Sequence, residues 1–279
     1  MNYNKKNIIF FSIIVVLCLC ISGAVYIYVG SGSKEIKTAK KFIENINNHN
    51  LVDIGGDEKL EFKSTTKSDS AGGKEYYSIE SKNFGIDIDG DYNVIGFSNN
   101  MSKSGDVNIS EDKAIQLGEE YLKYLYKGDY EFKEFVKETS EMNSPYYTII
   151  FTKIYNGYPF YNDKIMIGID KTNGKVDSYA NSTFQGKPEK IKIKKSEEDA
   201  IKVAMDSFSK MNSDGIVLDG TYKAFCDNKE SKETELCYII TIEGKDLEAN
   251  EVKMKYFVST ETGELINFSK DKITETVLN

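Results

Sequence analysis

The chain contains no arginine and no tryptophan, and it has a single histidine, His49, among 279 residues. Without arginine it lacks the planar guanidinium fork that best grips phosphate and carboxylate groups. One histidine cannot build a histidine-based metal site, and it is the only imidazole base available to a serine or cysteine nucleophile. His49 lies among asparagines, so we interpret it as a solvated side chain at a helix end. We therefore expect no catalytic, cofactor-binding or metal-binding residues.

Basic residues are outnumbered by acidic residues. The chain carries 44 acidic residues against 36 lysines, with a formal net charge of -8 and an isoelectric point near 5.0. Such a surface repels anionic polymers, which argues against a nucleic-acid partner. Hydrophobic residues make up 40% of the sequence, which is enough to form folded cores.

Residues 8–29 form a long apolar run, and at about 1.5 Å per residue a helix of this length crosses a bilayer. Lys5 and Lys6 precede the run, which favours a cytoplasmic N-terminus at residues 1–7 and export of the remainder. A cleaved signal peptide ending near Ala24 is the alternative, although the apolar run continues past it. We expect a single-pass protein of the cell membrane whose C-terminal region is extracytoplasmic.

The chain repeats itself after 86 residues. Each copy begins with a serine suited to capping a helix, followed by acidic residues that favour the positive end of the helix dipole. Apolar residues then recur at helical spacing, so each copy should begin with a helix that buries one face. The matching positions are Ser110, Glu111, Asp112, Ala114 and Ile115 in one copy and Ser196, Glu197, Glu198, Ala200 and Ile201 in the other.

Strand-like segments rich in aromatic and β-branched residues follow both helices, and each copy ends in a tight turn at Gly174 or Gly263. We therefore predict an α+β protein: an N-terminal transmembrane helix followed by tandem small modules, each a helix packed on an antiparallel β-sheet. Two modules are expected at residues 108–184 and 195–270. Residues 34–98 are expected to hold a third, degenerate module.

Within residues 34–98, an acidic stretch could be interpreted as a calcium-binding loop. Asp87, Asp89 and Asp91 alternate along the chain, but an EF-hand loop needs glycine and glutamate where Tyr92 and Ser98 stand. We interpret the stretch instead as a hairpin turn at residues 89–91.

The helix starts at residues 110–115 and 196–201, each followed by strands, and the turn at residues 170–176 resemble the PepSY domain, found in protease propeptides and in bacterial germination and cell-envelope proteins. The segment with Gly157, Tyr158 and Pro159 is similar to the related YcdB/YcdC-type repeats. This resemblance implies a noncatalytic, extracytoplasmic module that holds or inhibits peptidases or regulates wall enzymes. It provides no catalytic residues to transfer to this chain.

Four aromatic residues surround a glycine and a proline in the middle of the chain: Tyr155, Tyr158, Phe160 and Tyr161. If they are exposed, they form a candidate partner-contact loop, because tyrosine offers a large contact area at low entropic cost. The other interpretation is a turn that tucks Tyr158 and Phe160 into the core. Both interpretations remain open at this point.

Cys226 and Cys237 flank a polar loop at the ends of two strand-like segments. A cross-strand disulfide suits an exported domain. The alternative is two reduced thiols, and in both cases we expect a structural role.

These features predict a noncatalytic, membrane-tethered binding or regulatory protein without cofactors. The expected partner is another envelope protein, such as a peptidase or a cell-wall hydrolase. Two alternatives stay open: a carboxylate-dependent wall hydrolase, because acidic residues are plentiful, and a purely architectural spacer.

Overall fold

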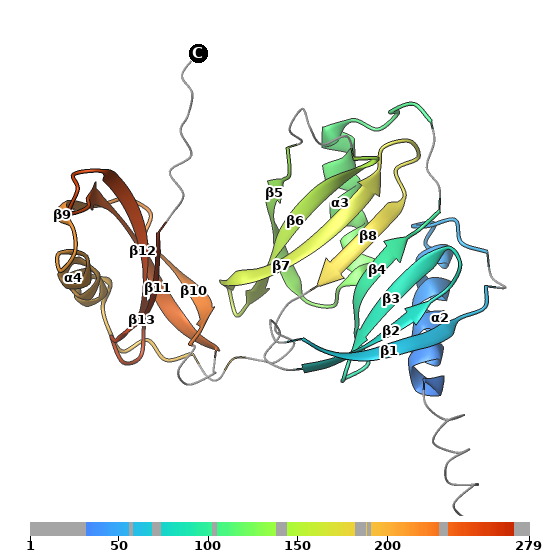
Figure 1. The fold of residues 1–279 in the computed structure, drawn as a ribbon, viewed down its shortest axis with the longest axis horizontal. Helices are drawn as coiled ribbons and strands as arrows, with labels where there is room; N and C mark the ends of the chain where they lie inside the picture. The colour runs from blue at the N-terminus through green and yellow to red at the C-terminus, as the bar shows by residue number, and fades with distance from the viewer. Residues whose placement is uncertain are drawn as a thin grey trace, which may run out of the picture. The chain divides into compact units, whose positions relative to one another are not determined.

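The computed structural model describes residues 32–55, 58–68, 74–101, 105–137, 144–181, 188, 191–228 and 234–270. This part of the chain is α+β, with three helices and mostly antiparallel strands, which confirms the α+β, antiparallel part of the prediction (Figure 1). The predicted membrane anchor lies outside the described residues. Among the described helices, none is long and apolar enough to cross a membrane.

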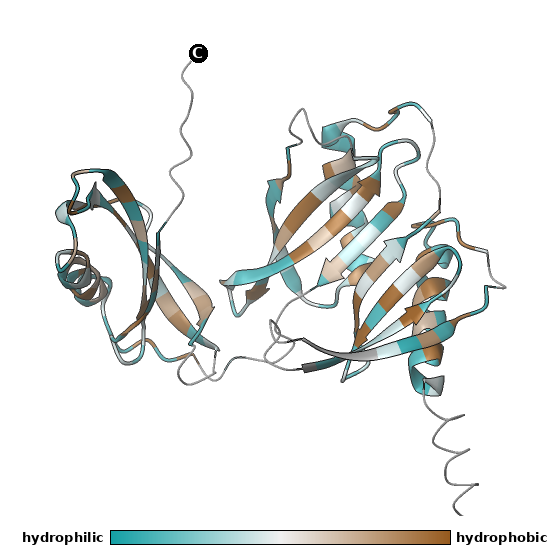
Figure 2. Ribbon diagram, viewed as in Figure 1, coloured by the Kyte–Doolittle hydropathy of each residue, from teal (hydrophilic) through white to brown (hydrophobic). Residues whose placement is uncertain are grey.

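The first helix packs on an antiparallel meander of four strands (Figure 1). Ala39, Ile43 and Ile46 are buried along one face of the helix, which is the apolar stripe of an amphipathic helix. Along the strands hydrophobic and polar residues alternate, which places one set of side chains in the core (Figure 2). The elements are α2 (Ser33–Asn48), β1 (Glu61–Ser68), β2 (Lys74–Glu80), β3 (Phe84–Asp89) and β4 (Val94–Asn99).

The second helix begins at the predicted N-cap, where the Ser110 hydroxyl accepts a hydrogen bond from the backbone N–H of Lys113 at 3.3 Å. It buries Ala114, Gly118 and Leu122. Gly118 allows a close approach to the sheet, since an added Cβ would lie 3.3 Å from Ile167. The elements are α3 (Glu111–Leu125), β5 (Asp129–Phe135), β6 (Tyr146–Tyr155), β7 (Tyr158–Asp170) and β8 (Val176–Asn181).

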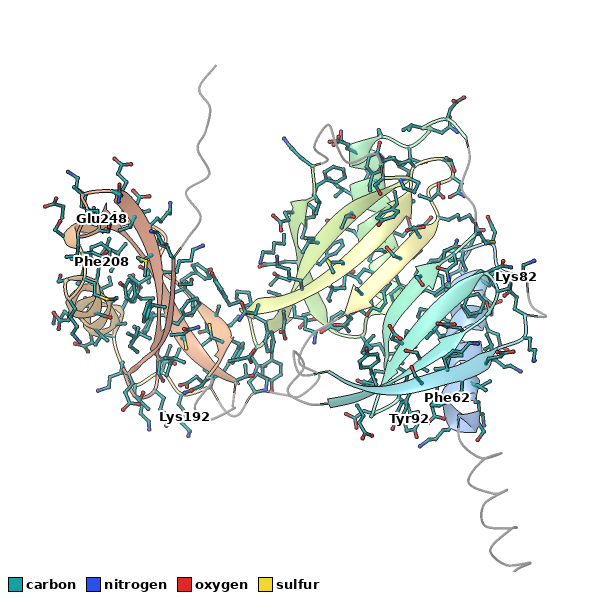
Figure 3. All side chains as sticks on the ribbon, viewed as in Figure 1. Phe62, Lys82, Tyr92, Lys192, Phe208 and Glu248 are labelled. Atoms are coloured by element: carbon teal, nitrogen blue, oxygen red, sulfur yellow. The ribbon has the colours of Figure 1, made fainter. Side chains whose placement is uncertain are left out.

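The third helix starts in the same way, with the Ser196 hydroxyl accepting from the backbone N–H of Asp199 at 3.1 Å. Its last residue, Phe208, is fully buried and is labelled in Figure 3. The ring lies against Gly215 and Gly244, where no side chain intervenes. The elements are α4 (Glu197–Phe208), β9 (Ser213–Val217), β10 (Tyr222–Asp227), β11 (Thr234–Lys245), β12 (Glu251–Ser259) and β13 (Leu265–Lys270).

The second and third copies share their backbone hydrogen bonds as well as their sequence pattern. In the second copy the carbonyl of Lys171 accepts from the N–H groups of Asn108 and Ile109, at 2.9 and 3.0 Å. In the third, the carbonyl of Thr260 accepts from Lys194 and Lys195 at the same two distances. In both copies, the turn that follows β7 or β12 therefore fixes the chain segment that leads into the helix.

A tyrosine adds a third hydrogen bond to each of these segments. The Tyr147 hydroxyl donates to the carbonyl of Ile109 at 3.0 Å, and the Tyr238 hydroxyl donates to the carbonyl of Lys195 at 2.9 Å. Gly174 and Gly263 have φ angles of +73° and +78°, which the predicted tight turns require of glycine. The sequence repeat is therefore a structural repeat down to individual bonds.

The described chain forms two compact units that are not the sequence repeats themselves. One unit contains the first helix and sheet together with α3, and within it β4 pairs antiparallel with β8. The other unit contains the third helix and its sheet, together with residues 150–165 from the β6–β7 hairpin. The predicted boundaries of the modules stay predictions.

Candidate functional site

The β6–β7 hairpin turns through Asn156 and Gly157, whose φ angles are +49° and +81°. Positive φ at both central residues defines a two-residue turn of type I′, whose twist matches the flanking strands. The Asn-Gly pair is well suited to this conformation, because both residues tolerate the left-handed region. The turn places Tyr155 and Tyr158 directly at the hairpin end.

The aromatic rings of this hairpin pack on β10 and β12. The centroid of Phe225 lies 5.0 Å from that of Phe160, 5.9 Å from Tyr155 and 6.4 Å from Tyr158. Tyr161 makes an edge-to-face contact with Phe257 at 4.7 Å. Such geometries are favourable for aromatic pairs. We call the group around Phe225 the aromatic cluster; it consists of Tyr155, Tyr158, Phe160, Ile191, Phe225 and Leu236.

The structure therefore gives the four predicted contact residues different surroundings. Phe160 is buried, in line with the core interpretation, whereas Tyr155, Tyr158 and Tyr161 are half-buried. Asn156 and Gly157 at the turn are exposed, as is Asn162 in β7. The hairpin presents partly exposed tyrosines and exposed asparagines. Its role as a partner-contact loop stays a prediction.

Sequence reasoning missed Phe225, which is the centre of the cluster and is 2% exposed. Phe225 pairs in register with Phe160 through a parallel contact between β10 and β7. Strands so far apart in the chain leave no periodic signal of their pairing. The only available sign was the aromatic side chain next to Cys226.

Both candidate disulfide residues are buried, and in the structure they are free thiols. In the β10–β11 ladder Cys226 stands opposite Glu235 and Cys237 stands opposite Ala224, so the two cysteines are diagonal neighbours. Diagonal positions have Cα atoms about 7–8 Å apart, beyond the usual disulfide span. A side-chain hydrogen bond with Cys237 that favours the protonated form of Cys226, together with burial, raises the pKa of the Cys226 thiol. A thiol of this kind is unreactive, and the disulfide stays a prediction.

We expect Cys226 and Cys237 to resist iodoacetamide in the folded protein and to react fully after unfolding in urea without reductant. Burial excludes the reagent, and the raised pKa of Cys226 suppresses the thiolate that attacks it. Mass spectrometry of the peptides that carry these two residues measures the result. Peptides that remain unmodified after unfolding and become reactive only with reductant would show the disulfide instead.

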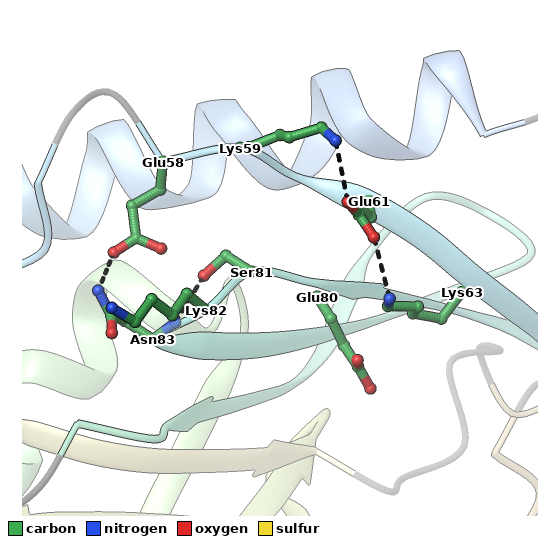
Figure 4. Close-up of a pocket in the computed structure, with 8 residues that line it drawn as sticks. All are labelled: Glu58, Lys59, Glu61, Lys63, Glu80, Ser81, Lys82 and Asn83. Atoms are coloured by element: carbon green, nitrogen blue, oxygen red, sulfur yellow. Dashed lines mark hydrogen bonds and ion pairs between the residues drawn. The ribbon is translucent and has the colours of Figure 1, made fainter.

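A charged hollow of about 550 Å³ lies in the first helix-and-sheet module (Figure 4). Within it, Lys59 and Lys63 approach the Glu61 carboxylate at 3.1 and 3.0 Å, and Asn83 donates to Glu58. Lysines and glutamates are equal in number, so the hollow has no net charge. Its lining residues are Glu58, Lys59, Glu61, Lys63, Glu80, Ser81, Lys82 and Asn83.

The Glu61 carboxylate of the hollow forms ion pairs with lysines at the protein surface. Hydrogen bonds from Lys63 and Lys59 lower the pKa of Glu61. A general acid for glycoside cleavage needs the opposite shift, a carboxyl group whose pKa is raised so that it keeps its proton. Half of the Glu61 side chain is exposed, so its ion pairs are screened by water. The hollow can hydrogen-bond a polar or zwitterionic group, but its chemistry does not favour hydrolysis.

The side chains of His49 and Asp89, which the sequence also brought into question, make local hydrogen bonds or ring contacts. The Nδ1 atom of His49 lies 2.8 Å from the carbonyl of Asn45, and its ring lies 4.0 Å from that of Tyr124. The Asp89 carboxylate accepts from the backbone N–H groups of Asp91 and Asn93, forming the predicted hairpin turn. Among the described residues, no three His, Cys, Asp or Glu side chains come together to hold a metal ion.

A helix followed by an antiparallel meander recurs along the described chain, which defines an α+β protein with repeated helix-and-sheet elements. Residues 75–183 match the YcdB, YcdC repeated domain, which confirms the resemblance seen in the sequence. The structure is similar to that of the Bacillus megaterium YpeB C-terminal domain, with a TM-score of 0.49 and 19% identity over 86% of this chain and 97% of that chain. A comparison with curated proteins finds no match.

Proposed function

We propose that this protein is a noncatalytic binding module that engages another protein of the cell envelope, such as a peptidase or a wall hydrolase, and regulates it. Residues 8–29 would tether it to the membrane and the rest would lie outside the cytoplasm. The YcdB, YcdC repeated domain at residues 75–183 supports a modular, repeat-type protein. The observation that carries the proposal is the rigid aromatic hairpin of β6 and β7.

The hairpin fits a binding role because its support is already formed. Phe160 and Phe225 pack beneath it, so little further ordering is needed when a partner binds. Tyr155 and Tyr158 are half-buried, so part of each side chain is accessible to a partner. Tyrosine is enriched at binding hot spots because one side chain provides both apolar area and a hydrogen-bonding group.

Site-specific photo-crosslinking in intact cells tests the proposal. A photoreactive phenylalanine analogue replaces Asn162, which is exposed beside the aromatic hairpin, or Asp91, which is exposed in the β3–β4 turn and serves as the control. We expect a defined envelope protein to be captured from position 162 and not from position 91. Mass spectrometry names the captured protein, and addition of the purified full chain then tests whether its activity changes.

Three results would each contradict the proposal. Equal capture at both positions, or none at either, would remove the hairpin as the contact. A purified full chain that degraded peptidoglycan, and lost this activity on Glu58→Gln or Glu61→Gln substitution, would establish the carboxylate hydrolase instead.

A further inference from the structure

The last strands of the three modules are equivalent. Strand β4 reads VIGFSN, β8 reads VDSYAN and β13 reads LINFSK. Each begins with a branched apolar residue and has an aromatic residue at its fourth position. The aromatic residues are Phe97, Tyr179 and Phe268.

Strands β4 and β13 also have the same geometry relative to the strand before them. Phe97 pairs with Ile86 and Phe268 pairs with Tyr256. In both ladders the register shifts two residues earlier in the strand, at Ile95 in β4 and at Ile266 in β13. A bulge at the same place bends both strands in the same way, so their outer edges have matching shapes.

Strands β4 and β8 use these edges to pair with each other. The ladder is antiparallel, and Phe97 stands directly opposite Tyr179. At this joint Phe97 is 3% exposed and Tyr179 is 2% exposed. The last-strand edge is therefore a joint between modules within this chain.

The equivalent edge in the third module is open. Strand β13 pairs with β12 on one side, and within the described residues no strand pairs with its other side. Phe268 is 46% exposed, although it stacks on Tyr256 at 6.0 Å. An unpaired edge with an exposed aromatic residue is a template for another strand, and proteins seldom leave one uncovered.

We propose that β13 pairs antiparallel with β13 of a second copy of this chain, in the register that joins β4 to β8. That register places the two aromatic positions opposite each other, so Phe268 faces Phe268 of the second copy. Asn267 then faces Ser269, and Ile266 faces Lys270. The two-fold axis passes between the Phe268 residues, which makes the interface isologous and closed.

The sequence of β13 suits this self-pairing. Its single lysine, Lys270, faces an isoleucine across the axis, so no two like charges meet directly. The opposed phenylalanines form a cross-strand aromatic pair, which is a favourable combination in an antiparallel ladder. The proposal is independent of the hairpin contact, which lies on β6 and β7.

Disulfide trapping in membranes tests the register. Phe268→Cys and, as the control, Lys270→Cys are each made in the full chain. Both variants also carry Cys18→Ser and Cys20→Ser, which remove the two cysteines of the apolar run at residues 8–29. Cysteines at position 268 face each other, whereas those at position 270 are offset by four residues, about 13 Å at the usual rise per residue. We expect oxidation to give a covalent dimer with Phe268→Cys and little with Lys270→Cys. Equal yields from both variants would overturn the proposal.

A charge variant tests the same interface without oxidation. Phe268→Lys places two ammonium groups opposite each other, whereas Ser269→Lys adds the same charge opposite Asn267. Sedimentation of the detergent-solubilised full chain should show a dimer for the parent and for Ser269→Lys, with dimerisation about ten-fold or more weaker for Phe268→Lys. Thermal unfolding by circular dichroism checks that both variants fold. A monomeric parent, or equal weakening by both lysines, would overturn the proposal.

Discussion

Replacing Phe225 by alanine is expected to lower the free energy of unfolding of the compact unit that contains it by about 3–5 kcal/mol. The side chain is 2% exposed and contacts Tyr155, Tyr158 and Phe160. Alanine would leave a cavity beneath the hairpin and remove three aromatic contacts together. Urea unfolding of the full chain, followed by far-UV circular dichroism, measures the loss.

Tyr222→Ala is the matched control for this substitution. Tyr222 lies in the same strand, is also aromatic and is 43% exposed. Truncation there should cost much less than at Phe225, on the order of 1 kcal/mol or below, because little cavity is created. If both variants lost the same stability, the aromatic cluster would not be a packed core, and the hairpin would lack its rigid support.

Gly244→Ala is expected to destabilise the third helix-and-sheet module by about 3 kcal/mol through overpacking. A Cβ at this position would lie 2.5 Å from the backbone oxygen of Ser213 and 2.7 Å from the Phe208 ring. A backbone oxygen in a paired strand cannot move aside cheaply, and Phe208 is itself fully buried. The shift in melting temperature, measured by circular dichroism, gives the size of the effect.

Gly55→Ala provides the comparison, because nothing lies within 4 Å of an added Cβ there. Alanine at this exposed position should change the free energy of unfolding by less than about 0.5 kcal/mol. A Gly244→Ala variant as stable as Gly55→Ala would mean that β9 and α4 do not approach β11 as closely as the structure shows.

The local elements were within reach of sequence reasoning. Ser110 and Ser196 were predicted to cap helices, and both hydroxyls accept the expected backbone hydrogen bonds. The tight turns at Gly174 and Gly263 also follow the prediction. These features depend on residues close together in the chain, where helical spacing and turn chemistry leave a readable pattern.

The pairing between distant strands was not predictable in this way. The sequences VIGFSN and VDSYAN contain no signal that β4 and β8 pair. The pairing depends on strand edges that only the folded chain brings together. The position of Phe225 beneath the hairpin has the same origin. The aromatic residues of the hairpin were recognised as a group, but the strand that supports them was not. The carboxylates of the hollow were not singled out, since acidic residues occur throughout the chain.

The shared turns have a consequence for proteolysis. The segment before α4 is rich in lysine, after which trypsin-like enzymes cleave. Such an enzyme needs several residues of extended chain whose backbone groups are free of hydrogen bonds. Here the N–H groups of Lys194 and Lys195 are both held by the carbonyl of Thr260, and the carbonyl of Lys195 is held by Tyr238. Cleavage at these two lysines requires the turn to open first, so the peptide bonds there are as resistant as the sheet that anchors the turn.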